Sequence, residues 1–283
     1  MHARLLVGIV IFAILDFSPF LSTKAQVAPA AGPDLTGYTL VFDEEFNGPL
    51  DVPSRYGWGS GGTTKWITHT PYTGDFGEAY FTGPSEPGTD DPFSIRNGIL
   101  TIQAWRDPNA NYHWRSGLLS SAGTDGRGFS QRFGYFECCM KLPSGVGVWP
   151  AFWLGDADGL RIPNQTKAEI DILEAYGDDP TSAYQRVHAW KPNGSDAHVL
   201  WNHSLKNGLT SDYHTYAALV NPDYIHFYID RVEQWKTPTY SEATHPLYVM
   251  VNLALGGGQS TDDTPNPSRL LIDYIRVYAP SNF

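Results

Sequence analysis

Short runs of β-branched and aromatic residues recur along this chain, and turn residues separate them. Asn97-Gly98 and Asn193-Gly194 are two of the separating turns. No stretch carries a sustained helical period of apolar residues with caps. The pattern predicts one all-β domain, and without an internal repeat an antiparallel sandwich is favoured over a propeller. The predicted strands cover residues 38–42, 99–105, 133–142, 184–190, 213–220, 224–229, 247–255 and 272–278.

The first 25 residues differ from the rest and are predicted to be a secretory signal peptide. Arg4 precedes the apolar run Leu5–Leu15, and small residues follow around Thr23 and Ala25. This run is too short to span a hydrocarbon core of about 30 Å at 1.5 Å per helical residue, so removal is favoured over anchoring. We expect cleavage after Ala25, a short linker over residues 26–35 and a single domain over residues 36–283. The mature protein is then secreted, extracellular or periplasmic, with no membrane attachment.

The net charge of the chain limits the kinds of molecule that it is expected to bind. The chain carries 30 Asp and Glu against 19 Lys and Arg, a formal net charge of −11. Nucleic acids and anionic membranes attract basic surfaces, so this balance argues against both as partners. We also expect the protein to be a monomer.

The two cysteines, Cys138 and Cys139, are neighbours in the sequence. Adjacent residues of a strand point to opposite faces, and a bridge between them would need unusual backbone geometry. The sequence therefore predicts one buried thiol and one partly exposed thiol.

Three carboxylates, Glu169, Asp171 and Glu174, interrupt an apolar, strand-like run. On a regular strand Glu169 and Asp171 share a face, whereas Glu174 falls on the opposite one. A β-bulge around Ile172 and Leu173 adds one residue and brings Glu174 to the side of the other two acids.

Such a trio of acids has chemical consequences. Two charges about 5 Å apart at an effective dielectric near 20 repel by roughly 3 kcal/mol, or about two pKa units. The cluster therefore holds a shared proton near neutral pH unless a metal neutralises it. A protonated carboxylic acid beside an ionised carboxylate is what double-displacement hydrolysis of a glycosidic bond requires. The alternative is that the acids form the solvated face of a strand.

The run Ala168–Glu174 resembles the Glu-x-Asp-x-x-Glu signature of glycoside hydrolase family 16, in its laminarinase-like branch. Other runs resemble the strands of that family, from about residue 36 to the C-terminus: Phe42–Gly48, Phe133–Glu137, Val148–Leu154, Val251–Gly257 and Asp273–Tyr278. The resemblance implies a concanavalin A-like β-jelly-roll sandwich of two curved antiparallel sheets, with an open cleft. It also makes residues 36–283 a catalytic domain.

The resemblance also implies roles for individual residues. Glu169 matches the nucleophile, Glu174 the general acid/base, and Asp171 the residue that hydrogen-bonds the nucleophile. Catalysis then needs no cofactor. One structural calcium ion is implied on the convex side, held by Glu45, the carbonyl of Gly98 and Asp273.

Substrate binding is predicted from aromatic and polar side chains. Trp149 and Trp153 share a strand face at i and i+4 and would stack on sugar rings, although both could instead lie in the core. His188 could reach Glu174 or a sugar hydroxyl, or serve a structural role. Asn252 resembles a cleft-lining position of the family. Weaker candidates for sugar platforms are Trp66, Trp114 and Trp190.

These observations predict a secreted retaining endo-β-glycosidase that hydrolyses internal β-1,3 or β-1,3-1,4 linkages of a glucan-type polysaccharide. The alternatives are a noncatalytic glucan-binding lectin and a transglycosylase of envelope or exopolysaccharide remodelling. The segment 163–168 lacks the Trp-Pro that laminarinases of this family often carry, which leaves laminarin in question. The acidic balance favours a neutral glucan, and the Gly- and Pro-rich stretch Thr68–Pro92 is expected to form loops over one end of the cleft.

Overall fold

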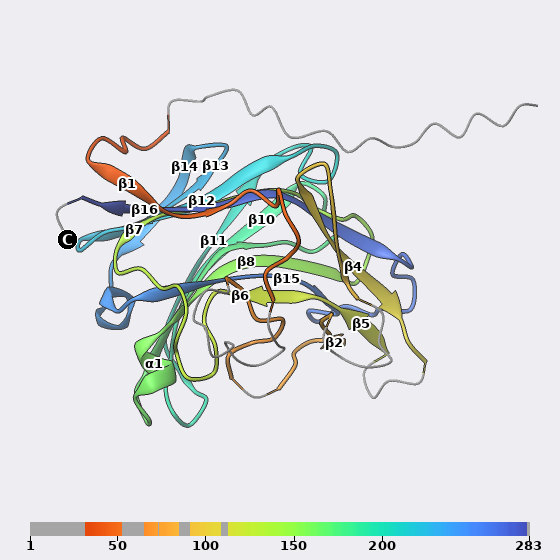
Figure 1. Cartoon of the computed structure of the whole chain (residues 1–283), viewed down its shortest axis with the longest axis horizontal. Helices are drawn as coiled ribbons and strands as arrows, with labels where there is room; N and C mark the ends of the chain where they lie inside the picture. The colour runs from red at the N-terminus through yellow and green to blue at the C-terminus, as the bar shows by residue number, and fades with distance from the viewer. Residues whose placement is uncertain (1–31, 53–64, 73, 85–90, 109–112, 282–283) are drawn as a thin grey trace, which may run out of the picture.

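The computed structural model describes residues 32–52, 65–72, 74–84, 91–108 and 113–281, which form two stacked sheets (Figure 1). Within these residues the larger sheet has ten strands in the order β14-β13-β12-β7-β16-β4-β5-β2, with β1 beside β16 and β3 beside β4. The smaller has six, in the order β11-β10-β9-β8-β15-β6. Pairing is antiparallel except between β2 and β5. The predicted all-β jelly-roll sandwich is confirmed.

The elements have the following bounds. The larger sheet contains β1 (Tyr38–Glu44), β2 (Ala79–Phe81), β3 (Phe93–Arg96), β4 (Ile99–Arg106), β5 (Trp114–Ser116), β7 (Gly134–Lys141), β12 (His214–Val220), β13 (Tyr224–Ile229), β14 (Val232–Pro238) and β16 (Ser268–Pro280). The smaller contains β6 (Leu118–Ser120), β8 (Val148–Asp156), β9 (Lys167–Glu174), β10 (Ser182–Trp190), β11 (Asp196–Leu205) and β15 (Leu247–Leu255). Two short helices, α1 (Asp158–Arg161) and η1 (Ser241–Thr244), connect strands.

All eight strands predicted from short runs are present, with shifts of a few residues at their ends. The run pattern missed the short strands β2, β3, β5 and β6, and it missed β11 and β14, each of which is the last strand at one end of its sheet. An edge strand has one neighbour and exposes much of its surface, so polar residues interrupt its apolar period. Asp, His and Asn do so in β11, and Glu, Gln and Lys do so in β14.

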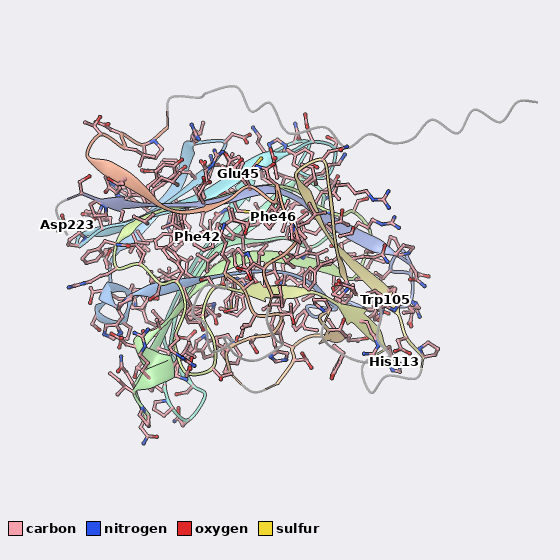
Figure 2. All side chains as sticks on the ribbon, viewed as in Figure 1. Phe42, Glu45, Phe46, Trp105, His113 and Asp223 are labelled. Atoms are coloured by element: carbon pink, nitrogen blue, oxygen red, sulfur yellow. The ribbon has the colours of Figure 1, made fainter. Side chains whose placement is uncertain are left out.

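The hydrophobic core lies between the two sheets, and side chains fill that space (Figure 2). Phe42 and Phe46 enter it from β1 and the turn that follows, and Phe152 enters it from β8. Trp66 and Trp114 are also fully buried there, so neither is a sugar platform. Burial of these large rings stabilises the sandwich because apolar area is removed from water.

The register of β9 contains the predicted bulge. Against β10, Tyr184 pairs with Glu174 and Arg186 with Asp171, so β9 has one residue more than its neighbour over this interval. The pairing of β9 with β8 shifts at the same place. Ile170, Ile172 and Leu173 all lie in the core between the sheets. The bulge thus leaves the apolar side of β9 buried while it resets the face on which Glu174 emerges.

The expectation of one partly exposed thiol is wrong, because Cys138 and Cys139 are both fully buried. They lie on β7, an interior strand between β12 and β16. Cys138 belongs to the core, whereas Cys139 on the outer face pairs with Thr215 and Tyr274 of the flanking strands. Burial raises the pKa of both thiols, most strongly that of Cys138.

The predicted signal peptide, residues 1–25, lies outside the described residues, as does most of the predicted linker. Leu35, at the end of that linker, packs against Tyr135, Ala217 and Tyr228 on the outer face of the larger sheet. Among the residues described, no helix has the length and apolar character needed to cross a membrane.

Burial of both cysteines predicts the reactivity of the folded chain toward Ellman's reagent. Because the reagent needs an accessible thiolate, we expect no reactive thiol in the native protein and two after denaturation in guanidinium chloride. Absorbance of the released product measures both numbers. One rapidly reacting thiol in the folded protein would contradict the burial of Cys139.

Candidate active site

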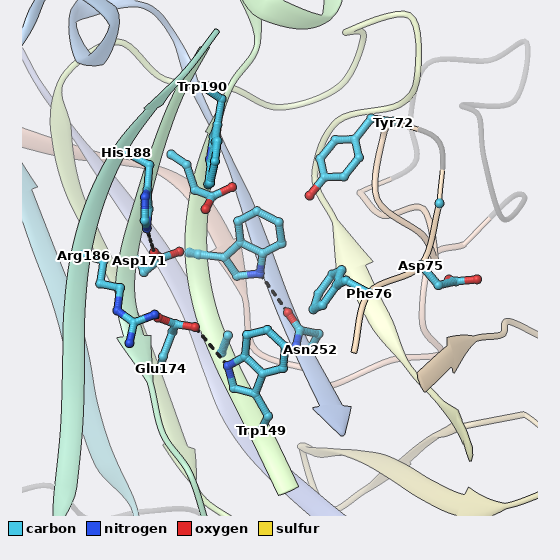
Figure 3. Close-up of a pocket in the computed structure, with 14 residues that line it drawn as sticks. Tyr72, Asp75, Phe76, Trp149, Asp171, Glu174, Arg186, His188, Trp190 and Asn252 are labelled. Atoms are coloured by element: carbon cyan, nitrogen blue, oxygen red, sulfur yellow. Dashed lines mark hydrogen bonds and ion pairs between the residues drawn. The ribbon is translucent and has the colours of Figure 1, made fainter. Parts of the chain in front are cut away.

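A pocket of about 410 Å³ lies on the face of the smaller sheet that points away from the core (Figure 3). It crosses β15, β8, β9 and β10, and one wall comes from Tyr72 and residues 74–76. The lining residues are Tyr72, Gly74, Asp75, Phe76, Trp149, Ala151, Trp153, Glu169, Asp171, Glu174, Arg186, His188, Trp190 and Asn252.

The three acids of β9 line this pocket together, as the sequence predicts. Glu169 and Asp171 share the face by strand alternation, and the bulge at Ile172 and Leu173 brings Glu174 to it. Asp171 and Glu174 are nearly buried, at 6% and 5% exposure. The carboxylates therefore stand in a partly desolvated site and not on an open polar face.

Burial raises the pKa of Glu169 and of Glu174 well above the usual range of a glutamate, and the charge of Asp171 raises both further. His188 and a hydrogen bond from Trp190 act in the opposite direction on the pKa of Glu169. When carboxyl groups interact this strongly, their protons leave in steps that belong to the pair. The site therefore holds a shared proton near neutral pH, in agreement with the sequence argument.

Asp171 is paired with His188, which a second acid holds in place. Nε2 of His188 lies 3.4 Å from Oδ2 of Asp171, and Nδ1 lies 2.5 Å from Oδ2 of Asp196. Burial alone would lower the pKa of His188, but Asp171 and Asp196 raise it to about 9. His188 is therefore an imidazolium at neutral pH and supplies positive charge beside the acids.

Glu174 has partners of its own. Nε1 of Trp149 donates a hydrogen bond of 2.9 Å to Oε1, and Nη1 of Arg186 lies 3.0 Å from Oε2 (Figure 3). The ion-pair contacts of His188 are with Asp171 and Asp196, and Arg186 makes the ion pair with Glu174. The bulge places His188 opposite Glu169, whereas the residue beside Glu174 is Tyr184, and Arg186 reaches Glu174 from between them.

Trp149 and Trp153 both line the pocket, in different ways. Trp153 is 5% exposed, and its Nε1 donates to Oδ1 of Asn252 at 2.8 Å. Trp149 is more open and stacks on Tyr176, with ring centroids 6.2 Å apart. Asn252 is fully buried, and its Nδ2 has no hydrogen-bond partner among the described residues.

The sequence reasoning missed Arg186, Asp196 and Tyr72 as parts of this site. Arg186 stands two residues before His188 on β10, so strand alternation could have identified it. Trp190, predicted as a weaker sugar platform, stands two residues after His188 and lines the pocket. Tyr72 and Phe76 belong to the stretch expected to lie over the cleft, and within its described part they line the pocket together with Gly74 and Asp75. No local sequence pattern points to Asp196.

Ligand atoms of Glu169, Asp171 and His188 lie within 4.8 Å of one another, the spacing of a possible cation site. His188 would ligate a metal only as the neutral imidazole, because both ring nitrogens carry hydrogens in the imidazolium. The imidazolium and the Arg186 guanidinium supply the positive charge that a metal would otherwise provide at this site.

The residues expected to hold calcium lie near one place on β16, away from the pocket. β4 pairs with β16 up to Ile272, and β1 pairs with it from Ile275, so Asp273 lies between the two partners. Gly98 and Glu45 adjoin the ends of β4 and β1 that meet there. The carboxylate of Glu45, however, is 2.5 Å from Nη2 of Arg276. The Glu45 carboxylate is therefore paired with an arginine, which leaves its main-chain oxygen as the donor it could offer a cation.

Comparison with known proteins gives consistent matches. The family model described as glycosyl hydrolases family 16 matches residues 90–276. An endo-1,3-1,4-beta-glycanase of Rhizobium meliloti is 34% identical over 212 residues, covering 71% of this chain and 43% of that protein. Glucan endo-1,3-beta-glucosidase A1 of Niallia circulans is 28% identical over 285 residues, covering 89% of this chain and 39% of that protein. The chain thus spans about two fifths of the length of these relatives.

A solved structure shows the same arrangement of strands. The catalytic domain of an endo-1,3-beta-glucanase (laminarinase) from Thermotoga petrophila is 25% identical, with a TM-score of 0.65. The match covers 87% of this chain and 99% of that chain.

The pair formed by His188 and Asp196 predicts a pH effect. In the variant Asp196→Asn, the pKa of His188 should fall from about 9 toward 6.5, because the anion at Nδ1 is lost. A folded-state pKa above 6.5 means that protonation stabilises the fold fully below that pH and ceases to do so as pH rises through about 9. The stability deficit of the variant should therefore shrink over this interval.

Histidine ring resonances followed by NMR titration measure the shift, and chemical denaturation at several pH values measures the deficit. His214, whose pKa is raised by Asp230, is an internal control that should not move. An unchanged His188 titration in the variant contradicts the assignment.

Proposed function

The chain belongs to glycosyl hydrolases family 16, and we propose that it is an endo-β-glucanase that hydrolyses internal β-1,3 or β-1,3-1,4 linkages with retention of configuration. The observation that carries the proposal is the convergence of Glu169, Asp171 and Glu174 in one partly desolvated pocket. The relatives named as an endo-1,3-1,4-beta-glycanase and a glucan endo-1,3-beta-glucosidase support a β-glucan substrate.

In the first step Glu169 attacks the anomeric carbon while Glu174 donates its proton to the leaving glycosidic oxygen. The C–O bond to the leaving sugar breaks as the bond to Glu169 forms. Burial and Asp171 raise the pKa of Glu169, and His188 and the Trp190 hydrogen bond oppose them in favour of the carboxylate form that the attack requires. Burial and Asp171 favour the protonated form of Glu174, which the donation requires.

In the second step Glu174, now a carboxylate, takes a proton from water as the water attacks the anomeric carbon and releases Glu169. Arg186 and the indole of Trp149 favour this ionised form of Glu174. The same partners therefore hold the side chain in place through both steps. Asp171 stays between the two glutamates, balanced by the imidazolium of His188.

Product analysis separates this function from its two alternatives. Incubation with laminarin, mixed-linkage β-glucan and agarose should produce new reducing ends and shorter oligosaccharides from a β-glucan. Longer chains would indicate transglycosylation, and sedimentation with insoluble glycan without products would indicate a lectin. A lectin is disfavoured because a sugar-binding site gains little from three clustered acids that repel one another.

We further propose that the protein is exported as a monomer after cleavage at Ala25. The Arg4 and Leu5–Leu15 pattern supports export, and the acidic balance supports action on a neutral polymer. N-terminal sequencing of secreted protein from an expressing host and light scattering of the purified protein test the two parts separately.

The roles of the two glutamates predict the outcome of a chemical rescue. Glu174→Ala should lower turnover of polysaccharide by about 10²- to 10⁴-fold, because the proton donor is lost. With an activated aryl β-glycoside and sodium azide, activity should return, since azide attacks the glycosyl-enzyme without needing a base. Mass spectrometry and NMR should identify a β-glycosyl azide.

Glu169→Gln is the matched variant, and azide should not restore its activity in this way, because no covalent intermediate forms. Absence of rescue in Glu174→Ala, or normal turnover by Glu169→Gln, contradicts the assigned roles.

We also propose one structural calcium ion at Asp273 and the carbonyl of Gly98. Glu45 would contribute through its main-chain oxygen, because Arg276 binds its carboxylate. When bound, the ion would fasten the ends of β1 and β4 to β16 and would take no part in catalysis. Its effect should therefore be on stability.

Chelation tests this ion. A ligand at about 100 times its Kd stabilises the folded state by about 2.7 kcal/mol, which raises the melting temperature of a domain this size by roughly 5–10 °C. EDTA should remove that increment from the unaltered protein, and Asp273→Asn should abolish the response. Glu45→Gln should keep it. Equal melting curves with calcium and with EDTA contradict the site.

A further inference from the structure

The pocket ends at β10, but the smaller sheet continues for one more strand, β11, where only Asp196 has been assigned a role. This edge strand carries Trp201, which is 62% exposed. Indole rings are expensive to leave in water and are frequent where a protein contacts a ligand. The position of Trp201 relative to the catalytic residues decides what such a ligand would be.

The pairing of β10 with β11 fixes the face on which Trp201 lies. Trp201 is directly opposite Arg186, and His203 is directly opposite Tyr184. Opposite residues of an antiparallel pair share a face, with Cα atoms about 4.5–5.5 Å apart. The rings of Tyr184 and His203 stack at 4.7 Å, which confirms the shared face. Because Arg186 lines the pocket, Trp201 stands on the pocket side of the sheet.

A continuous path therefore leads from the catalytic acids to this tryptophan. Glu174 on β9 is 3.0 Å from Arg186 on β10, and Arg186 is the cross-strand neighbour of Trp201 on β11. Two strand spacings separate β9 from β11, or on the order of 10 Å. The path runs across the strands in the same direction as the pocket, which crosses β15, β8, β9 and β10.

We propose that Trp201 is a sugar-binding platform beyond the pocket, which stacks on a pyranose residue of the same polysaccharide chain that is cut at Glu169 and Glu174. The inference rests on the proposed function. A pyranose ring has an apolar C–H face edged by hydroxyls, and Trp201 supplies a flat apolar surface. Arg186 and His203 flank it with hydrogen-bonding groups on the same face. The platform makes β11 a determinant of substrate length.

The occupant follows from continuity with the catalytic pocket. A second copy of the chain would instead have to use the free edge of β11, where Leu200 is also 41% exposed on the other side of the strand. The two occupants would contact different residues of β11. A sugar chain needs Trp201 and not Leu200, whereas an edge-to-edge dimer involves both faces of the strand.

The test compares long and short substrates of the full-length protein. Trp201→Ala should raise KM about three- to tenfold on laminarin or mixed-linkage β-glucan, the scale of one aromatic contact. On an activated aryl glycoside too short to reach β11, kcat and KM should be unchanged. Trp201→Phe, which keeps a flat ring, should recover most of the loss.

Leu200→Ala is the matched control, since it removes apolar surface one residue away on the opposite side of the strand. It should leave KM unchanged on every substrate, and light scattering should give one monomeric mass for all variants. Equal KM values for Trp201→Ala and the unaltered protein on long chains overturn the platform, as does a change in oligomeric state.

Failure of the unaltered protein to cut any β-glucan would overturn the proposed hydrolysis instead. In that case, affinity electrophoresis in gels containing laminarin or mixed-linkage β-glucan still tests Trp201 through binding alone, and equal retardation of Trp201→Ala and the unaltered protein there overturns the platform.

Discussion

Mutual repulsion among three carboxylates is the constraint around which the rest of this site is arranged. A single additional residue in β9 brings the third acid to the face of the other two. There burial and like charge raise the pKa of both Glu169 and Glu174. Such a cluster would be costly without compensation, because each ionised group loses water and gains no counter-ion. The side chains of β10 supply that compensation.

The compensation follows the alternation of β10. Arg186, His188 and Trp190 stand two residues apart on one face, and each acts on a different acid. Arg186 faces Glu174, His188 faces Asp171, and Trp190 hydrogen-bonds Glu169. The two glutamates thus have different surroundings although they lie on the same strand. The proposed mechanism assigns them different roles, one as nucleophile and the other as proton donor.

The sequence predicts the features that depend on residues close together in the chain. Runs of β-branched and aromatic residues predict most of the longer strands, and parity alone predicts the bulge that unites the acids. It was insufficient where the answer depends on neighbouring strands. Cys139 is buried because β7 has a partner on each side, and His188 contacts Asp171 because the bulge changes the cross-strand register. The edge strands β11 and β14 were not predicted, because they are partly exposed to solvent and carry polar residues that interrupt the apolar pattern.

The catalytic residues and the outlying substrate-contacting residues lie on different parts of the sheet, and this separation affects how such a chain can evolve. The groups proposed to break the bond project from β8, β9 and β10, and neighbours on both sides hold each of these strands. The surfaces that would contact the rest of a polymer lie around Tyr72 and on β11, outside these three strands. Mutations there can alter which polymer is accepted while the carboxylates keep their geometry. One fold can in this way come to accept different polymers while its catalytic residues stay the same.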